Sequence, residues 1–189
     1  MSVGTVVLEC DGCGASFSRG VLYGDFWYQM PNGNRYPLDR ALGWCNFCAL
    51  MVAVEDLSGD RVNEEIKRAE TWKYEAEQKL KRSLFSKLFG DEKARIARCD
   101  QELKMLRDNL AFLRARTSPS RCLDCGSSDI VILPTPPWPE DVGVDVPAGW
   151  NHPLCGGRMV AKALPGRLHF SYPPRVFNEH GVSITSECD

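Results

Sequence analysis

The chain has no run of 18 or more apolar residues, and this absence predicts that no helix of it spans a membrane. Its first residues, MSVGTVVLECDGCG, contain neither the basic start nor the apolar stretch of a secretory signal peptide. We therefore expect a cytoplasmic protein. In that compartment cysteines stay reduced, and Cys-x-x-Cys pairs more often serve metal or redox chemistry than disulfides.

Features of enzymes are also missing from the sequence. It has no glycine-rich loop of the kind that cradles phosphate, and no nucleophile beside a general base. These absences predict that the protein is not an enzyme.

Cysteine and charge, by contrast, are plentiful and unevenly placed, and they divide the chain into segments 1–60, 61–116 and 117–189. Four of the nine cysteines fall in the first segment, one in the second and four in the third. The middle segment carries fifteen Lys or Arg against ten Asp or Glu, whereas acidic residues are in excess in both flanks. We expect three domains with these boundaries.

The middle segment has the pattern of two paired helices. Residues 61–83 and 91–116 contain no Gly or Pro, and their apolar residues recur in steps of three and four, which is typical of a coiled-coil seam. The seam positions are Val62, Ile66, Ala69, Ala76 and Leu80, with Lys73 among them, and Ile96, Cys99, Leu103, Leu106, Leu110 and Leu113. The pattern predicts a long antiparallel hairpin that turns at 84–91. The same seams would also suit pairing between two copies of the chain, as a homodimer.

In the first segment, Cys10, Cys13, Cys45 and Cys48 form two Cys-x-x-Cys pairs. Four thiolates in two such pairs are typical of a tetrahedral zinc site. A redox Cys-x-x-Cys is the alternative, but the βαβ setting of that motif is missing. Gly14 suits a tight knuckle, and the sequence after Cys48, ALMVAVEDL, is compatible with a helix. A knuckle followed by a pair at a helix start resembles the treble-clef zinc fingers.

In the third segment, Cys122, Cys125, His152 and Cys155 form the second predicted zinc site. HPLCGG at 152–157 repeats the Cys-x-x-Cys-Gly frame with His152 in the first position, and imidazole can replace thiolate on zinc. Two facing knuckles resemble the zinc-ribbon superfamily. The proline-rich stretch 132–150 between them is expected to be an extended loop packed on this module, with a role as a partner's ligand as the alternative.

Each predicted site has four protein ligands and no open position, so both zinc ions are expected to be structural. The predicted fold class is α+β, with two small zinc-stapled β-rich modules, one treble-clef-like and one zinc-ribbon-like, joined by the helical hairpin. Modules of 60–70 residues have small cores, which a metal can stabilise.

The expected hairpin tip combines large apolar residues with basic ones, namely Leu84, Phe85, Lys87, Leu88 and Phe89. These residues close the turn or form a contact surface for a protein partner. The layout is similar in outline to zinc-finger coiled-coil transcription factors that insert a hairpin tip into bacterial RNA polymerase, although their tips are acidic and this one is apolar and basic. A short membrane-surface contact of the tip is a weaker alternative.

These patterns predict a non-enzymatic adaptor or regulatory protein that presents its hairpin tip to a protein partner. The alternative is a nucleic-acid-binding or transcription-associated protein, because zinc ribbons often bind nucleic acid and the hairpin is basic. Against that alternative, both flanks are acidic and the isoelectric point is about 6.0.

Overall fold

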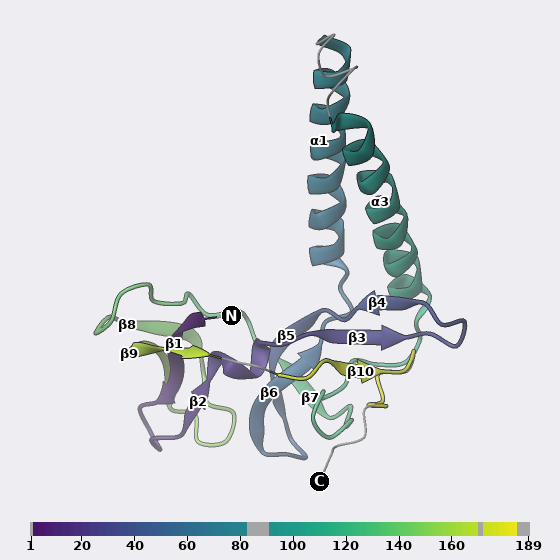
Figure 1. The fold of residues 1–189 in the computed structure, drawn as a ribbon. Helices are drawn as coiled ribbons and strands as arrows, with labels where there is room; N and C mark the ends of the chain where they lie inside the picture. The colour runs from purple at the N-terminus through teal and green to yellow at the C-terminus, as the bar shows by residue number, and fades with distance from the viewer. Residues whose placement is uncertain (1, 83–90, 170–171, 185–189) are drawn as a thin grey trace. The chain divides into compact units, whose positions relative to one another are not determined.

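The structure, a computed structural model, describes residues 2–82, 91–169 and 172–184 (Figure 1). It divides the chain into two compact units, one formed by Met1–Asp56 and Ser118–Asp189 together and the other by Leu57–Thr117. The helical segment thus has nearly the predicted bounds. The prediction of two separate flanking domains is wrong, because the flanks fold as one unit, which we call the β unit.

The described residues contain ten strands, two α-helices and one short 3-10 helix, which confirms the predicted α+β class. The elements that precede the hairpin are β1 (Ser2–Cys10), β2 (Ser16–Ser18), η1 (Arg19–Leu22), β3 (Phe26–Gln29), β4 (Arg35–Pro37), β5 (Arg40–Cys45) and β6 (Leu50–Glu55). The helices α1 (Asp60–Arg82) and α3 (Glu92–Ala115) follow, and then β7 (Ile130–Ile132), β8 (Asp145–Asn151), β9 (Arg158–His169) and β10 (Arg175–Phe177). None of the helices in the described ranges has both the length and the apolar character to cross a bilayer.

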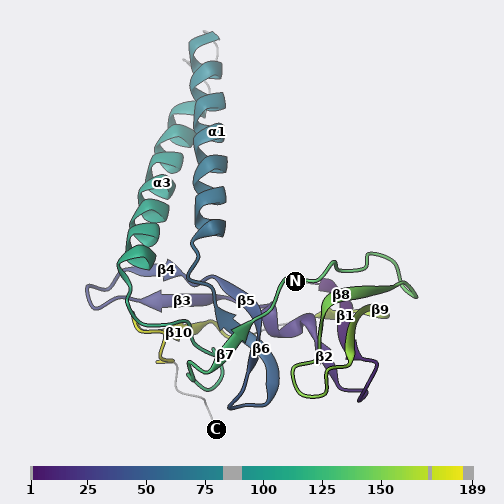
Figure 2. The ribbon, with the colours of Figure 1, turned by 180° about the vertical axis from the view of Figure 1, so that it is seen from behind.

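Every sheet of the β unit combines strands from both sides of the hairpin. The strand orders are β2-β1-β9-β8, β10-β3-β4 and β6-β5-β7. Figure 2 shows β5, β6 and β7 side by side, as their antiparallel registers require. A flank of about 60 residues buries little apolar surface alone, so two flanks that share their sheets can build a larger core.

The main core of the β unit has contributions from both flanks. Its buried residues are Leu8, Cys10, Leu42, Trp44, Met51, Leu133, Ala148, Met159 and Ala161.

A buried carboxylate connects the two flanks at the end of β6. Glu55 is fully buried, accepts a hydrogen bond from the hydroxyl of Tyr28 at 2.9 Å, and accepts another from the backbone amide of Arg121 at 3.0 Å.

The stretch after Cys48 is a strand and not the start of a helix, which corrects the treble-clef-like arrangement expected for the first flank. Residues 50–55 form β6, which pairs with β5 through a tight turn at 46–49. The β-branched Val52 and Val54 suit this strand, and both are buried in a small cluster with Cys45 and Cys122. Tertiary pairing with β5 therefore overrides the helix-compatible pattern of this stretch.

The proline-rich segment is partly loop and partly edge strand. Residues 145–151 form β8 at the edge of its sheet, where Pro147 is tolerated. The loop before it is packed on the protein, as expected. Pro136 is fully buried, Trp138 packs against the main core, and the indole N–H of Trp150 donates to the Pro134 carbonyl at 3.1 Å.

The two helices lie side by side and antiparallel, and each finds its partner within the same chain (Figure 1). Most of the predicted seam positions are buried, namely Val62, Ala69, Ala76, Cys99, Leu103, Leu106, Leu110 and Leu113. Small residues of α1 face the leucine-rich stripe of α3, so the two backbones can approach closely.

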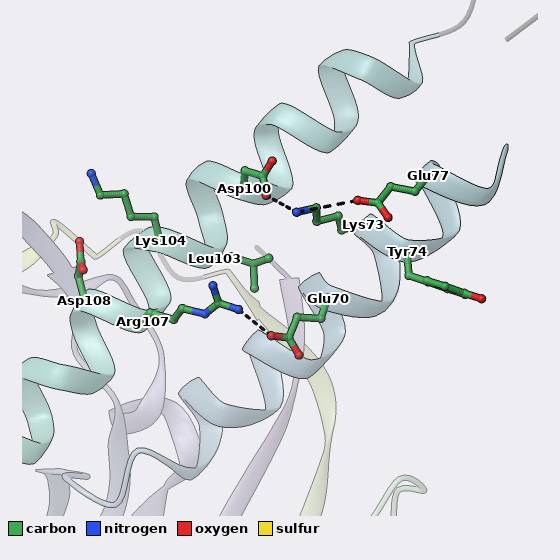
Figure 3. A pocket seen from close by; sticks show the side chains of 9 residues that line it. All are labelled: Glu70, Lys73, Tyr74, Glu77, Asp100, Leu103, Lys104, Arg107 and Asp108. Atoms are coloured by element: carbon green, nitrogen blue, oxygen red, sulfur yellow. Dashed lines mark hydrogen bonds and ion pairs between the residues drawn. The ribbon is translucent and has the colours of Figure 1, made fainter. Parts of the chain in front are cut away.

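Lys73, the charged residue on the seam, is accommodated by an ion pair with the opposite helix. Its Nζ lies 2.6 Å from Asp100 Oδ1 and 3.9 Å from Glu77 Oε1 (Figure 3). A second ion pair between the helices joins Arg107 to Glu70 at 2.8 Å.

The expected tip residues, Leu84, Phe85, Lys87, Leu88 and Phe89, lie outside the described residues.

Candidate metal centres

Each of the four Cys-x-x-Cys or His-x-x-Cys ligand pairs is followed by a residue with positive φ. In three of them, the residue after the second ligand is a glycine with positive φ. The backbone amide of this glycine donates a hydrogen bond to the carbonyl of the first ligand residue at 2.9 Å. The three glycines are Gly14, Gly126 and Gly156, with φ of +72°, +75° and +72°. The fourth pair, Cys45 and Cys48, is followed by Ala49 with φ of 51°, the one non-glycine residue with positive φ in the described part of the chain. The knuckle at Cys45 and Cys48 thus shares the positive φ of the other three, with alanine in place of glycine.

The knuckles meet in twos and form two clusters of ligand atoms. Cys10, Cys13, His152 and Cys155 make up the mixed cluster, and Cys45, Cys48, Cys122 and Cys125 make up the four-cysteine cluster. Within each cluster all the ligand atoms lie within 4.8 Å of one another. In the part of the chain that the structure describes, no other group of His, Cys, Asp or Glu side chains converges in this way.

The distances between ligand atoms match a metal-sized tetrahedron. In the mixed cluster, Cys10 Sγ lies 3.4 Å from Cys155 Sγ, and His152 Nδ1 lies 3.1 Å from that same Sγ. In the four-cysteine cluster, Cys45 Sγ lies 3.6 Å from Cys125 Sγ. A metal–sulfur bond of about 2.3 Å gives tetrahedral edges of about 3.8 Å, so these sulfurs need to move by only a few tenths of an ångström to bind a metal.

All eight predicted ligand residues are in these clusters, but the sequence-based grouping of the pairs is wrong. It assigned the pairs at 10–13 and 45–48 to one site, and those at 122–125 and 152–155 to the other. Each cluster instead joins one pair from before the hairpin to one from after it. The reason is topological: β1 pairs with β9, which brings Cys10 to the knuckle before β9, while β5 pairs with β7 beside the Cys122 knuckle.

Burial raises the pKa of two thiols in the four-cysteine cluster. The pKa of Cys122 rises to about 11, mainly because the thiol is desolvated. Desolvation also raises the pKa of Cys48 well above its usual range, and neighbouring thiols add to the effect. Both groups are protonated near neutral pH in the absence of a metal, so a metal ion must displace their protons when it binds.

Two contacts that were not predicted from the sequence hold the knuckles of the mixed cluster against each other. Asp11 accepts hydrogen bonds from the amide of Arg158 at 2.7 Å and from its Nε at 2.8 Å, and these bonds, the side-chain one foremost, lower the pKa of Asp11. The knuckles also touch through glycines, because a Cβ on Gly157 would meet Cys10 Sγ at 2.6 Å and the amide nitrogen of Gly12 at 2.8 Å. The second glycine of the motif HPLCGG was the available signal for such a close approach.

The imidazole of His152 is oriented by aromatic rings, which were not predicted from the sequence either. Its Nδ1 faces the sulfurs of Cys13 and Cys155, at 3.4 Å and 3.1 Å. Its Nε2 is buried and has no hydrogen-bond partner among the described residues. The ring of Trp44 meets the imidazole edge to face at 5.3 Å between centroids, and Phe17 lies 5.8 Å away. Nδ1 is therefore the nitrogen positioned to bind a metal.

Two further hollows of the described surface have none of the eight ligand residues in their lining. A groove of about 460 Å³ between α1 and α3 is lined by the charged pairs described above (Figure 3). A second hollow, of about 290 Å³, lies in the β unit between Tyr23, Phe26, Tyr172 and Arg175. Arg175 is engaged there by Asp124 at 2.8 Å.

Comparison with known proteins gives no relative for this chain. No protein-family model, no curated protein and no solved structure matches it. The evidence for function therefore lies in two features of the chain itself: its clusters of thiol and imidazole ligands, and the helical unit inserted between the flanks that supply them.

Proposed function

We propose that the protein is a non-enzymatic adaptor in which two structural zinc ions hold the β unit together and the helical hairpin is offered to a protein partner. The observation that carries this proposal is that each cluster brings together four protein ligands. A metal with four protein ligands has no place for water or substrate, whereas catalytic zinc keeps a position open.

Zinc is the metal that best suits these ligands. Thiolate and imidazole donors in a tetrahedral arrangement are typical of structural zinc, and paired knuckles resemble the zinc-ribbon superfamily. We expect the purified protein to contain two zinc ions per chain by elemental analysis. One or no metal ion in a folded protein, or iron with its visible absorption, would contradict the assignment.

The absence of enzymatic activity follows from the same clusters. The thiol pairs that could perform disulfide exchange are all committed to metal binding in this proposal, so none is free to act as a nucleophile. We expect no hydrolase activity and no thiol–disulfide exchange. Insulin reduction that depends on Cys10 or Cys122 would contradict this expectation.

The hairpin is the part of the chain that the metal clusters do not use. All eight ligands and all three sheets belong to Met1–Asp56 and Ser118–Asp189, and the described elements of Leu57–Thr117 are helices. We propose that α1 and α3 form a coiled coil and that Leu84, Phe85, Lys87, Leu88 and Phe89 at its tip contact the partner. The described residues of this insertion supply no ligand and no strand to the β unit, so the insertion is well suited to a role in binding.

A double substitution at the tip tests this role. Phe85→Asp with Phe89→Asp should weaken capture of the partner more than tenfold, because apolar anchors typically contribute about 2 kcal/mol each. Tyr74→Asp is the matched control, since this ring is 62% exposed on α1 away from the tip. Unchanged capture by the tip variant would contradict this role. A lowered melting temperature together with unchanged capture would show that the two rings only close the turn.

Nucleic-acid binding is the second candidate, and the excess of basic residues in 61–116 favours it. In that case, neutralising Lys79, Lys81, Arg82 and Lys87 together should abolish binding, and the affinity should fall steeply with salt. The tip substitution Phe85→Asp with Phe89→Asp would then have little effect beyond its added charge. The two sets of variants thus separate the two candidates.

A further inference from the structure

Strand β5 connects the two metal clusters through adjacent residues. Cys45 is a ligand of the four-cysteine cluster, whereas the ring of Trp44 packs against His152 of the mixed cluster. Successive side chains of a strand point to opposite faces, so one strand can serve both clusters at neighbouring positions. Trp44 is 1% exposed and His152 is 4% exposed, which makes this a buried contact.

This contact sets the position of a metal ligand. With Nδ1 turned to the sulfurs and Nε2 enclosed in the interior, the imidazole has one orientation in which it can bind a metal. The indole of Trp44 packs edge to face against the imidazole of His152. The ring of Phe17 in turn packs against Trp44, with 6.4 Å between the ring centroids. Partners that fix the orientation of a metal-bound histidine commonly change metal affinity by about 10- to 100-fold.

The path of the chain couples the clusters in a second, weaker way. Cys13 and His152 are 139 residues apart, and Cys45 and Cys125 are 80 residues apart within that interval. Once a metal joins Cys45 to Cys125, the chain between Cys13 and His152 is effectively shortened. Because a shorter loop loses less entropy on closure, this shortening should raise the metal affinity of the mixed cluster roughly threefold.

We propose that the two metal clusters bind cooperatively and that Trp44 is the positioning residue that carries most of the coupling. A metal in the four-cysteine cluster fixes β5 at Cys45, which holds Trp44 against His152 and orients Nδ1 before the second metal arrives. Linkage requires the reverse effect to be equally large. The inference rests on the proposed metal binding and adds to it the order and strength with which the sites fill.

Cobalt(II) titration of the full-length chain tests the coupling, because coordination by four thiolates and coordination by three thiolates and an imidazole give distinct visible bands. Cys125→Ser disables the four-cysteine cluster from a knuckle that is not part of β5. It should raise the Kd of the mixed cluster for cobalt at least about tenfold. In a Trp44→Leu background the same change should raise that Kd only about threefold, the part due to chain closure.

Leu42→Ala is the matched control, because Leu42 is 3% exposed and lies in β5 two residues before Trp44, on the same face. In this background Cys125→Ser should keep its full effect. If Trp44→Leu does not fold, Trp44→Phe, which keeps a ring in place, should leave an effect between the two values. His152→Ala should weaken the four-cysteine cluster by the same factor as Cys125→Ser weakens the mixed cluster.

An equal effect of Cys125→Ser with and without Trp44 would overturn the role of this residue. No effect of Cys125→Ser on the Kd of the mixed cluster would overturn the coupling itself. Failure of the proposed metal binding has a different signature, since the wild-type chain would then show no thiolate–cobalt bands at all.

Discussion

The sulfur atoms of Cys45 and Cys125 lie 3.6 Å apart, although 80 residues separate them in the chain. The whole helical unit lies within that interval, and the same is true of Cys10 and Cys155, which are 145 residues apart. A metal in either cluster therefore closes a loop that contains the hairpin. Metals bound in these clusters would connect the two flanks and would not stabilise each flank separately.

Pairs of ligand substitutions should reveal the crossed arrangement through metal content. Cys45→Ser with Cys125→Ser should leave one metal ion per chain, because both residues belong to the four-cysteine cluster. Cys45→Ser with Cys13→Ser should leave none, because it damages both clusters. Elemental analysis of the folded fraction measures this content, and the reverse result would restore the grouping by sequence segment.

Ala49→Gly should stabilise the metal-loaded protein by about 0.5–1 kcal/mol. Ala49 occupies a left-handed conformation that the other three knuckles fill with glycine, and a residue with a Cβ is strained there. Ala41→Gly in β5 is the matched control and should destabilise the protein, because glycine weakens a strand. Denaturant melts of both variants give the two free-energy changes, and equal changes would contradict the role of strain.

Lys73→Met should preserve or raise the melting temperature of the hairpin and remove part of its salt dependence. The substitution replaces a charge on the seam by an apolar chain of similar length. The bond to Asp100 raises the pKa of Lys73 above its usual 10.5, so the ion pair stabilises the hairpin below that pH and is lost as pH rises beyond it. Lys104→Met, in the same groove but without an ion pair among the described residues, should leave the alkaline melting profile unchanged.

Metal binding should release protons and should strengthen as pH rises. The four-cysteine cluster should release about two protons or more near neutral pH, since Cys122 with a pKa of about 11 and Cys48 with its raised pKa are protonated before the metal arrives. Each released proton makes the apparent affinity about tenfold higher per pH unit. Calorimetry in buffers of different ionisation enthalpy counts the protons, and the Cys125→Ser variant shows the part due to the other cluster. Binding without proton release would contradict the pKa shifts.

The sequence was informative about the knuckles and the helix seam, which are local properties. The knuckle frame identifies His152 as the equivalent of a cysteine, and the steps of three and four identify the stripe that buries Leu103 and Leu106. Both signals act within a few residues, over which backbone geometry determines which side chains can meet. For the same reason, the sequence predicted the helical segment nearly to its bounds.

The partners of the knuckles could not be read in this way, because they depend on strand pairing between distant segments. The spacing within a pair is equally compatible with any second pair, and the entropy of loop closure rises only slowly with length. Trp44 was missed for a related reason. Nothing beside it in the chain indicates that His152 will pack against its ring 108 residues later.

The exit of the chain after Asp56 and its return at Ser118 leave the hairpin free to vary in length. One heptad added to α1 and one to α3 would preserve the stripe of facing apolar residues and change no ligand, no sheet and no knuckle. Each such step would lengthen the hairpin by about 10 Å. Chains with the same β unit could thus carry hairpins of different length, which would differ in steps of seven residues per helix.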